Sequence, residues 1–125
     1  MQTSLKWKLA QSAEIRWWKN YLKTQTVEDY LSYKKKYWKD FLRTIDPHSQ
    51  LPANATVLDA GCGPAGIYIV MNEQTVTAVD PLLDQYEAEL PHFSKANYPN
   101  INFVTSGLEA FRTNTPFEYV FCLNA

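Results

Sequence analysis

The chain has 125 residues, of which 46% are hydrophobic and 20% charged, as in a globular protein with one hydrophobic core. Its two cysteines, Cys62 and Cys122, exclude a disulfide framework and a cysteine-based metal site. No apolar run approaches the roughly 20 residues that cross a membrane, and no secretory signal follows Met1. We therefore expect a cytoplasmic protein with reduced thiols, no metal and no membrane partner.

Basic and acidic residues are unevenly distributed along the chain. Residues 1–45 hold ten Lys and Arg against four Asp and Glu, whereas residues 46–125 hold two against nine. Such a split is typical of a protein that binds nucleic acid or an anionic membrane, but also of two parts of one molecule that attract each other. Because no nucleic-acid-binding motif accompanies the charge, we favour the second interpretation and do not expect a nucleic-acid partner.

Two amphipathic helices are predicted before residue 47. In the first, apolar side chains recur every four residues: Leu5, Leu9, Ala13, Trp17 and Tyr21, with Trp18 and Leu22 widening the stripe. The second helix is expected to begin at Thr26, whose hydroxyl can accept a hydrogen bond from the Asp29 N–H, and to end before Pro47. Its apolar face comprises Val27, Leu31, Trp38, Phe41, Leu42 and Ile45, and is interrupted at Lys34 and Lys35. We expect residues 1–46 to form a helical cap on a domain of residues 47–125.

From Ala55 onward, short apolar strands alternate with short helices. Strands are predicted at residues 56–60, 75–79, 101–105 and 118–123, and helices at residues 65–72 and 82–90. This alternation is typical of βαβ units with right-handed crossovers. The sequence therefore predicts an α/β fold with a Rossmann-like parallel sheet.

The pattern Gly61-x-Gly63-x-x-Gly66 lies between the first predicted strand and the first short helix. Glycines allow the backbone to turn tightly and to approach a ligand closely, and a helix N-terminus offers free N–H groups. The second strand ends at Asp80, 19 residues after Gly61, where a ribose-binding carboxylate is expected. Asp59 precedes the loop, and its charge would repel a dinucleotide pyrophosphate but attract a cationic cofactor.

Three segments lie in order along residues 52–125: Val57-Leu58-Asp59-Ala60-Gly61-Cys62-Gly63, Val76-Thr77-Ala78-Val79-Asp80-Pro81 and Phe117-Glu118-Tyr119-Val120-Phe121-Cys122. They resemble the first, second and strand-four motifs of class I S-adenosylmethionine-dependent methyltransferases. The resemblance implies S-adenosylmethionine as the cofactor and methyl transfer to an acceptor, which we expect to be a small molecule.

The resemblance also implies roles for particular residues. The loop of Gly61, Cys62 and Gly63 would let the methionine part of the cofactor lie against the backbone. Asp59 would bind near the amino group of the cofactor, and Asp80 would accept hydrogen bonds from the ribose hydroxyls. The other predicted contacts, with the adenine and from the strand-four side, are Pro81, Leu82, Gly107, Leu108, Cys122 and Asn124. Many members of the family carry an acid or amide after the third strand, where this chain has Gly107, and no catalytic residue is assigned.

Several of these residues also have a simpler structural explanation. Asp59 could cap the following helical turn, and Asp80, which precedes a proline, could be a turn residue. Cys62 is expected to pack in the loop and Cys122 in the core of its strand, rather than to act as nucleophiles. The aromatic residues of the first two helices could pack on the sheet or could roof the cofactor cleft.

We therefore predict a methyltransferase, or a fragment or subunit that binds S-adenosylmethionine or S-adenosylhomocysteine without turnover. A nucleotide-dependent oxidoreductase and a basic, aromatic module for nucleic acid or lipid are less favoured. The chain ends just after the fourth predicted strand, whereas the family sheet has seven strands, so we expect a sheet truncated after strand four. Residues 118–123 would then form an open apolar edge, covered by a second copy of the chain or by a missing C-terminal half.

Overall fold

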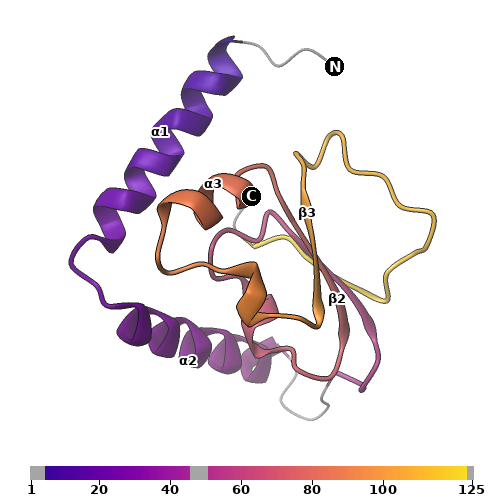
Figure 1. Cartoon of the computed structure of the whole chain (residues 1–125). Helices are drawn as coiled ribbons and strands as arrows, with labels where there is room; N and C mark the ends of the chain where they lie inside the picture. Colours follow the sequence, from indigo (N-terminus) through magenta and orange to yellow (C-terminus); the bar gives the residue numbers. More distant parts are fainter. Residues whose placement is uncertain (1–4, 46–50, 124–125) are drawn as a thin grey trace.

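The structure, a computed structural model, describes residues 5–45 and 51–123 (Figure 1). Helices α1 (Leu5–Leu22) and α2 (Val27–Ile45) precede strand β1 (Thr56–Ala60) and the 3-10 turn η1 (Ile67–Val70). They are followed by strand β2 (Thr75–Asp80), helix α3 (Leu83–Glu89), the 3-10 turn η2 (Lys95–Asn97) and strands β3 (Ile101–Thr105) and β4 (Tyr119–Phe121). In residues 5–45 and 51–123, no helix has the length and apolar character needed to cross a membrane.

The described strands form one parallel sheet in the order β3-β2-β1-β4. Thr56 of β1 pairs with Thr75 of β2, and Val57 of β1 pairs with Tyr119 of β4. Val57 and Val76 are almost completely buried, as β-branched residues in the middle of a parallel sheet are expected to be. The predicted α/β class with a Rossmann-like parallel sheet is confirmed.

Two predicted elements are shorter than expected. In place of a helix over residues 65–72, the chain forms only the 3-10 turn η1, whose residues Ile67, Ile69 and Val70 are β-branched and lose rotamer freedom in a helix. The fourth strand covers Tyr119–Phe121 rather than residues 118–123, because only these three residues pair with β1.

The buried face of α1 differs from the predicted stripe. Leu5, Leu9 and Trp17 are exposed by 73%, 61% and 56%, whereas Ile15 and Leu22 are buried and Trp18 is half-buried. The predicted four-residue spacing was therefore wrong, whereas Trp18 and Leu22, which the prediction added to the stripe, do lie on the buried side. The buried residues follow spacings of three and four residues, which keep side chains closer to one face of a helix.

Helix α2 begins as predicted, because the Asp29 N–H donates to the Thr26 hydroxyl oxygen at 3.1 Å. Its buried face is centred on Tyr30 and Trp38. Lys34 interrupts the apolar pattern without breaking the packing, since its ammonium nitrogen lies 4.8 Å from the ring centroids of both Tyr37 and Trp38. Burial lowers the pKa of Lys34.

One hydrophobic core joins the N-terminal helices to one face of the sheet. It includes Ile15 of α1, Trp38 of α2, Tyr86 of α3 and Val76 of β2. Figure 1 shows α1, α2 and α3 on one side of the sheet and the long loop between β3 and β4 extending away from them. Phe103 points toward the helices, because its ring packs edge-on against Tyr68 and Phe93.

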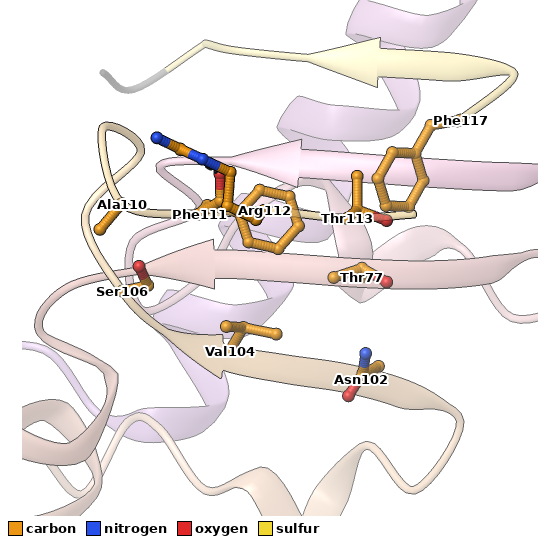
Figure 2. Close-up of a pocket in the computed structure, with 9 residues that line it drawn as sticks. All are labelled: Thr77, Asn102, Val104, Ser106, Ala110, Phe111, Arg112, Thr113 and Phe117. Atoms are coloured by element: carbon orange, nitrogen blue, oxygen red, sulfur yellow. Dashed lines mark hydrogen bonds between the residues drawn. The ribbon is translucent and has the colours of Figure 1, made fainter. Parts of the chain in front are cut away.

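The other face of the sheet carries a groove of about 420 Å³. Side chains alternate between the faces of a strand, so Asn102 and Val104 point away from Phe103 and line this groove. Figure 2 shows them beside Thr77 of β2, with Phe111, Arg112 and Phe117 of the loop before β4 near the same face. The groove is thus separated by the sheet from the face on which the helices pack.

Strand β4 lies at an edge of the described sheet, with Val120 exposed by 59% and Tyr119 by 37%. An apolar edge with unpaired backbone groups is a surface on which another strand can add. Association through β4, with a second copy or with a further segment, stays a prediction.

Candidate functional site

The carboxyl ends of the strands meet at one edge of the sheet. Ala60 at the end of β1 pairs with Val79, Asp80 at the end of β2 pairs with Thr105, and Phe121 of β4 pairs with Asp59. In an open parallel sheet, this is the edge at which ligands bind. The glycine loop and both predicted carboxylates lie there.

The loop after β1 turns sharply. Gly61 and Gly63 have φ angles of 67° and 66°, a left-handed conformation that other residues adopt at a cost. The N–H groups of Gly61 and Cys62 both donate to the Val79 carbonyl, at 2.8 and 3.0 Å, and so attach the loop to β2. The loop is therefore positioned by its glycines and by the sheet together.

Gly66 serves a different purpose from the two preceding glycines. Its backbone is in the extended region, but a Cβ there would lie 2.4 Å from Asp59 Oδ2 and 2.6 Å from the Cys62 carbonyl oxygen. The missing side chain thus leaves the space that the Asp59 carboxylate occupies.

Asp59 is 2% exposed, and its Oδ2 accepts a hydrogen bond from the Tyr68 N–H at 3.2 Å. This carboxylate therefore caps η1, as the simpler explanation of Asp59 predicted. Burial raises the pKa of Asp59 to about 7, the Tyr68 N–H opposes this rise, and the charge of Asp80 adds to it. Each carboxylate oxygen has more than one lone pair, so the Tyr68 hydrogen bond does not use all the acceptor capacity of Asp59.

Asp80 joins the glycine loop to the start of α3. Its Oδ2 accepts from the Gly63 N–H at 3.0 Å, and its Oδ1 accepts from the Leu82 N–H at 2.9 Å. The hydrogen bond from Leu82 closes the local turn that was predicted as the simpler structural role of Asp80. Burial raises the pKa of Asp80, while the Leu82, Gly63 and Tyr86 hydrogen bonds oppose the rise.

A third carboxylate, which the sequence did not indicate, belongs to Glu14 of α1. The Tyr86 hydroxyl donates to Glu14 Oε2 at 3.1 Å. Burial raises the pKa of Glu14, the Tyr86 hydrogen bond opposes this, and the charge of Asp80 raises it further. In residues 5–45 and 51–123, no Lys or Arg forms an ion pair with Glu14, Asp59 or Asp80.

The buried acid has a consequence for stability. Since the pKa of Asp59 is about 7 in the folded chain and about 4 in the unfolded one, the folded state binds more protons between these values. Stability should therefore fall as pH rises from 4 to 7, and Asp80 and Glu14 act in the same direction.

We expect Asp59→Asn to be more stable than the unchanged protein at pH 8, by about 2 kcal/mol, and its stability to depend less on pH. Urea unfolding followed by circular dichroism at several pH values measures both. Glu73→Gln removes an exposed carboxylate that lies two residues before the start of β2, and it should change neither. Parallel pH profiles for Asp59→Asn and the unchanged protein would contradict the raised pKa.

The residues predicted for the adenine lie beside Asp80. Pro81 is half-buried and Leu82 is buried, and Gly107 and Leu108 follow β3, where the Ser106 N–H donates to the Asp80 carbonyl at 3.3 Å. A Cβ at Gly107 would lie 2.2–2.7 Å from the Glu109 carboxyl group. Glu109 therefore places an acid in the space next to Gly107, although it stands two positions later in the sequence.

The cysteines differ in environment. Cys62 is buried in the loop, as predicted, and burial together with the charges of Asp59 and Asp80 raises the pKa of its thiol well above the ordinary value. Cys122 is exposed, so its predicted place in a strand core was wrong, because β4 ends at Phe121. Asn124 lies outside the described residues.

The aromatic residues of the first two helices lie in three different environments, and a role in roofing a cofactor cleft stays a prediction. Tyr30 and Trp38 are buried in the core, and the Trp38 Nε1–H donates to the Ala65 carbonyl of the glycine loop at 2.9 Å. Trp18 reaches the same loop from α1, its Cζ2 atom lying 3.9 Å from the position of a Cβ at Gly63. Trp17 and Tyr21 stack on each other, with ring centroids 5.0 Å apart, on the exposed side of α1.

Comparison with known proteins found no family model that matches this chain and no curated protein that resembles it.

Proposed function

We propose that this chain binds S-adenosylmethionine at the glycine loop and belongs to a methyltransferase that modifies a small-molecule acceptor. The observation that carries the proposal is a pair of buried carboxylates, Asp59 and Asp80, on either side of a left-handed glycine loop at the carboxyl edge of a parallel sheet. Two buried carboxylates without a Lys or Arg partner among the described residues favour a ligand that carries positive charge, because such a ligand would stabilise their charged forms. S-adenosylmethionine carries both an ammonium and a sulfonium group. A dinucleotide pyrophosphate would add negative charge to the same place.

In this proposal, the glycine loop supports the methionine part, Asp59 receives the ammonium group and Asp80 receives the ribose hydroxyls. Pro81, Leu82 and Leu108 would contact the adenine, and Glu109 would accept from its amino group. Methyl transfer itself requires an acceptor aligned with the sulfonium carbon in a site that excludes water. Trp18, which is half-buried, and the buried loop would exclude water on the α1 side.

Ligand preference tests the proposal. Calorimetry should detect binding of S-adenosylmethionine and S-adenosylhomocysteine, and no binding of NAD. Asp80→Ala should weaken both interactions by about 1–3 kcal/mol, because the ribose hydroxyls lose a charged acceptor. Asp84→Asn, which changes an exposed carboxylate on the surface of α3, should bind as the unchanged protein does.

Preference for NAD would overturn the proposal. An unchanged affinity in Asp80→Ala would mean that Asp80 does not bind the ribose and only stabilises the local turn. Because Asp80 also holds two backbone N–H groups, thermal unfolding of each variant without ligand accompanies the titrations. Formation of S-adenosylhomocysteine in the presence of small-molecule acceptors would distinguish an enzyme from a protein that binds without turnover.

A further inference from the structure

Helix α1 carries an apolar stripe that the fold leaves uncovered, and we call it the outer stripe. Its members recur every four residues, and all of them are exposed: Leu5 (73%), Leu9 (61%), Ala13, Trp17 (56%) and Tyr21 (41%). The helix packs on the core through Ile15 and Leu22 instead. Figure 1 shows α1 at the outside of the molecule, with the other elements on one side of it only. The outer stripe therefore lies on the solvent side of the helix.

Basic side chains accompany the outer stripe. Lys6 and Arg16 are exposed, and each lies three residues from a member of the stripe, a spacing that places side chains on one face of a helix. Glu14 is the one acidic residue of α1, and it accepts a hydrogen bond from Tyr86 of α3. The exposed surface around the outer stripe thus combines apolar and positively charged side chains.

The acidic part of the chain leaves most of this positive charge without a partner. In residues 5–45 and 51–123, the only ion pair that joins the N-terminal helices to the rest of the chain is Lys19–Glu89, at 3.3 Å. The other ion pairs of the basic part lie within α2. Attraction between the two parts of the chain therefore does not account for Lys6 and Arg16, whose charges can serve a partner outside it.

We propose that the outer stripe of α1 docks on the surface of a membrane that contains anionic phospholipid. An amphipathic helix that lies in the plane of such a surface buries leucines at the acyl boundary and holds its basic residues at the phosphates. The rings of Trp17 and Tyr21 suit the same layer, since each has an apolar body and a polar tip. The expectation of no membrane partner rested on the lack of a spanning segment, which a helix lying on one leaflet does not need.

Other partners fit the outer stripe less well. Nucleic acid would match the charges of Lys6 and Arg16, but its phosphates offer no apolar layer to Leu5 and Leu9. The acidic side chains of a second copy would match the same charges, but they too would leave these leucines in water. A lipid surface is the partner that satisfies both properties of the stripe.

Binding of the whole chain to vesicles tests the proposal. Flotation with vesicles of equal phosphatidylcholine and phosphatidylglycerol should show binding at least about tenfold stronger than with phosphatidylcholine alone, and added salt should weaken it. Replacing both bases, Lys6→Gln with Arg16→Gln, should weaken binding to the anionic vesicles about tenfold. Leu9→Ser should weaken it about fivefold, because a leucine no longer leaves water.

Two matched controls keep the charge and the apolar surface apart from the position. Lys35→Gln with Lys39→Gln removes the same charge from exposed positions of α2, and Val120→Ser removes a side chain that is 59% exposed on β4. Both should bind vesicles as the unchanged protein does. Circular dichroism of every variant shows whether it is folded.

Several results would overturn the proposal. These are equal binding to both kinds of vesicle, binding to neither, and equal weakening by the charge changes in α1 and in α2. Self-association, or a complex with mixed RNA and DNA, that is lost in the variant lacking Lys6 and Arg16 would assign the stripe to that partner instead. None of these measurements involves S-adenosylmethionine, so their outcome is independent of the proposed function.

Discussion

Replacing Trp38 with alanine is expected to lower the free energy of unfolding by about 3–5 kcal/mol, since a large buried ring leaves a cavity behind. Trp38 is 2% exposed, packs edge-on against Phe41 and donates its indole N–H to the Ala65 carbonyl. A loss of this size is a large fraction of the roughly 5–15 kcal/mol that stabilises a typical domain. Urea unfolding followed by far-ultraviolet circular dichroism measures it.

Two further variants separate the parts of this effect. Trp38→Phe keeps most of the ring but leaves the Ala65 carbonyl without its donor, so a loss of about 1–3 kcal/mol is expected. Trp17→Ala removes a tryptophan that is 56% exposed on the neighbouring helix, and should cost less than about 0.5 kcal/mol. Equal losses for Trp38→Ala and Trp17→Ala would show that α2 does not anchor the glycine loop.

Gly66→Ala is expected to destabilise the protein by about 2–3 kcal/mol and to abolish ligand binding, because the new methyl group overlaps two atoms of the site. These atoms are Asp59 Oδ2 and the Cys62 carbonyl oxygen, at 2.4 and 2.6 Å. The Cys62 carbonyl is backbone and Asp59 is held by Tyr68, so neither can move without losing a contact. Urea unfolding and calorimetry with S-adenosylmethionine report the two effects.

Gly107→Ala provides the matched control. The three atoms nearest to its new methyl group all belong to the carboxyl end of Glu109, an exposed side chain that can rotate away. We therefore expect its stability to change by less than about 0.5 kcal/mol. A comparable loss of stability in both alanine variants would mean that the overlap with Asp59 and Cys62 does not explain the effect of Gly66→Ala.

The sheet could be predicted from the sequence because local patterns dominate there. Residues 56–60 and 101–105 are short apolar, β-branched segments between turn signals, and β1 and β3 have these bounds in the structure. The placement of Asp59, Asp80 and the glycine loop at one edge follows from the parallel topology. The position of these site residues could therefore be predicted from the local sequence and the strand order alone.

The packing of α1 could not be predicted in the same way. This helix has apolar side chains at Leu5, Leu9 and Trp17 as well as at Ile15 and Leu22, so its sequence contains more than one apolar stripe. Which stripe is buried depends on where α1 meets α3 and the loop, and that is a tertiary property.

Glu14 and Glu109 were missed for a related reason. Each reaches the site from a neighbouring segment, Glu14 through Tyr86 and Glu109 by folding back over Gly107. Both contacts depend on side-chain direction rather than on a spacing motif. The presence of an acidic residue in a helix or a loop does not indicate which neighbouring segment its side chain will contact.

The contrast between the two thiols makes the natural chain suitable for site-specific spectroscopy. A maleimide reacts with an accessible thiolate, and Cys122 is exposed, whereas Cys62 is buried with a strongly raised pKa. A single fluorophore or spin label can therefore be attached next to β4 without removing any native cysteine. Its mobility and emission would report directly on whatever pairs with that edge of the sheet.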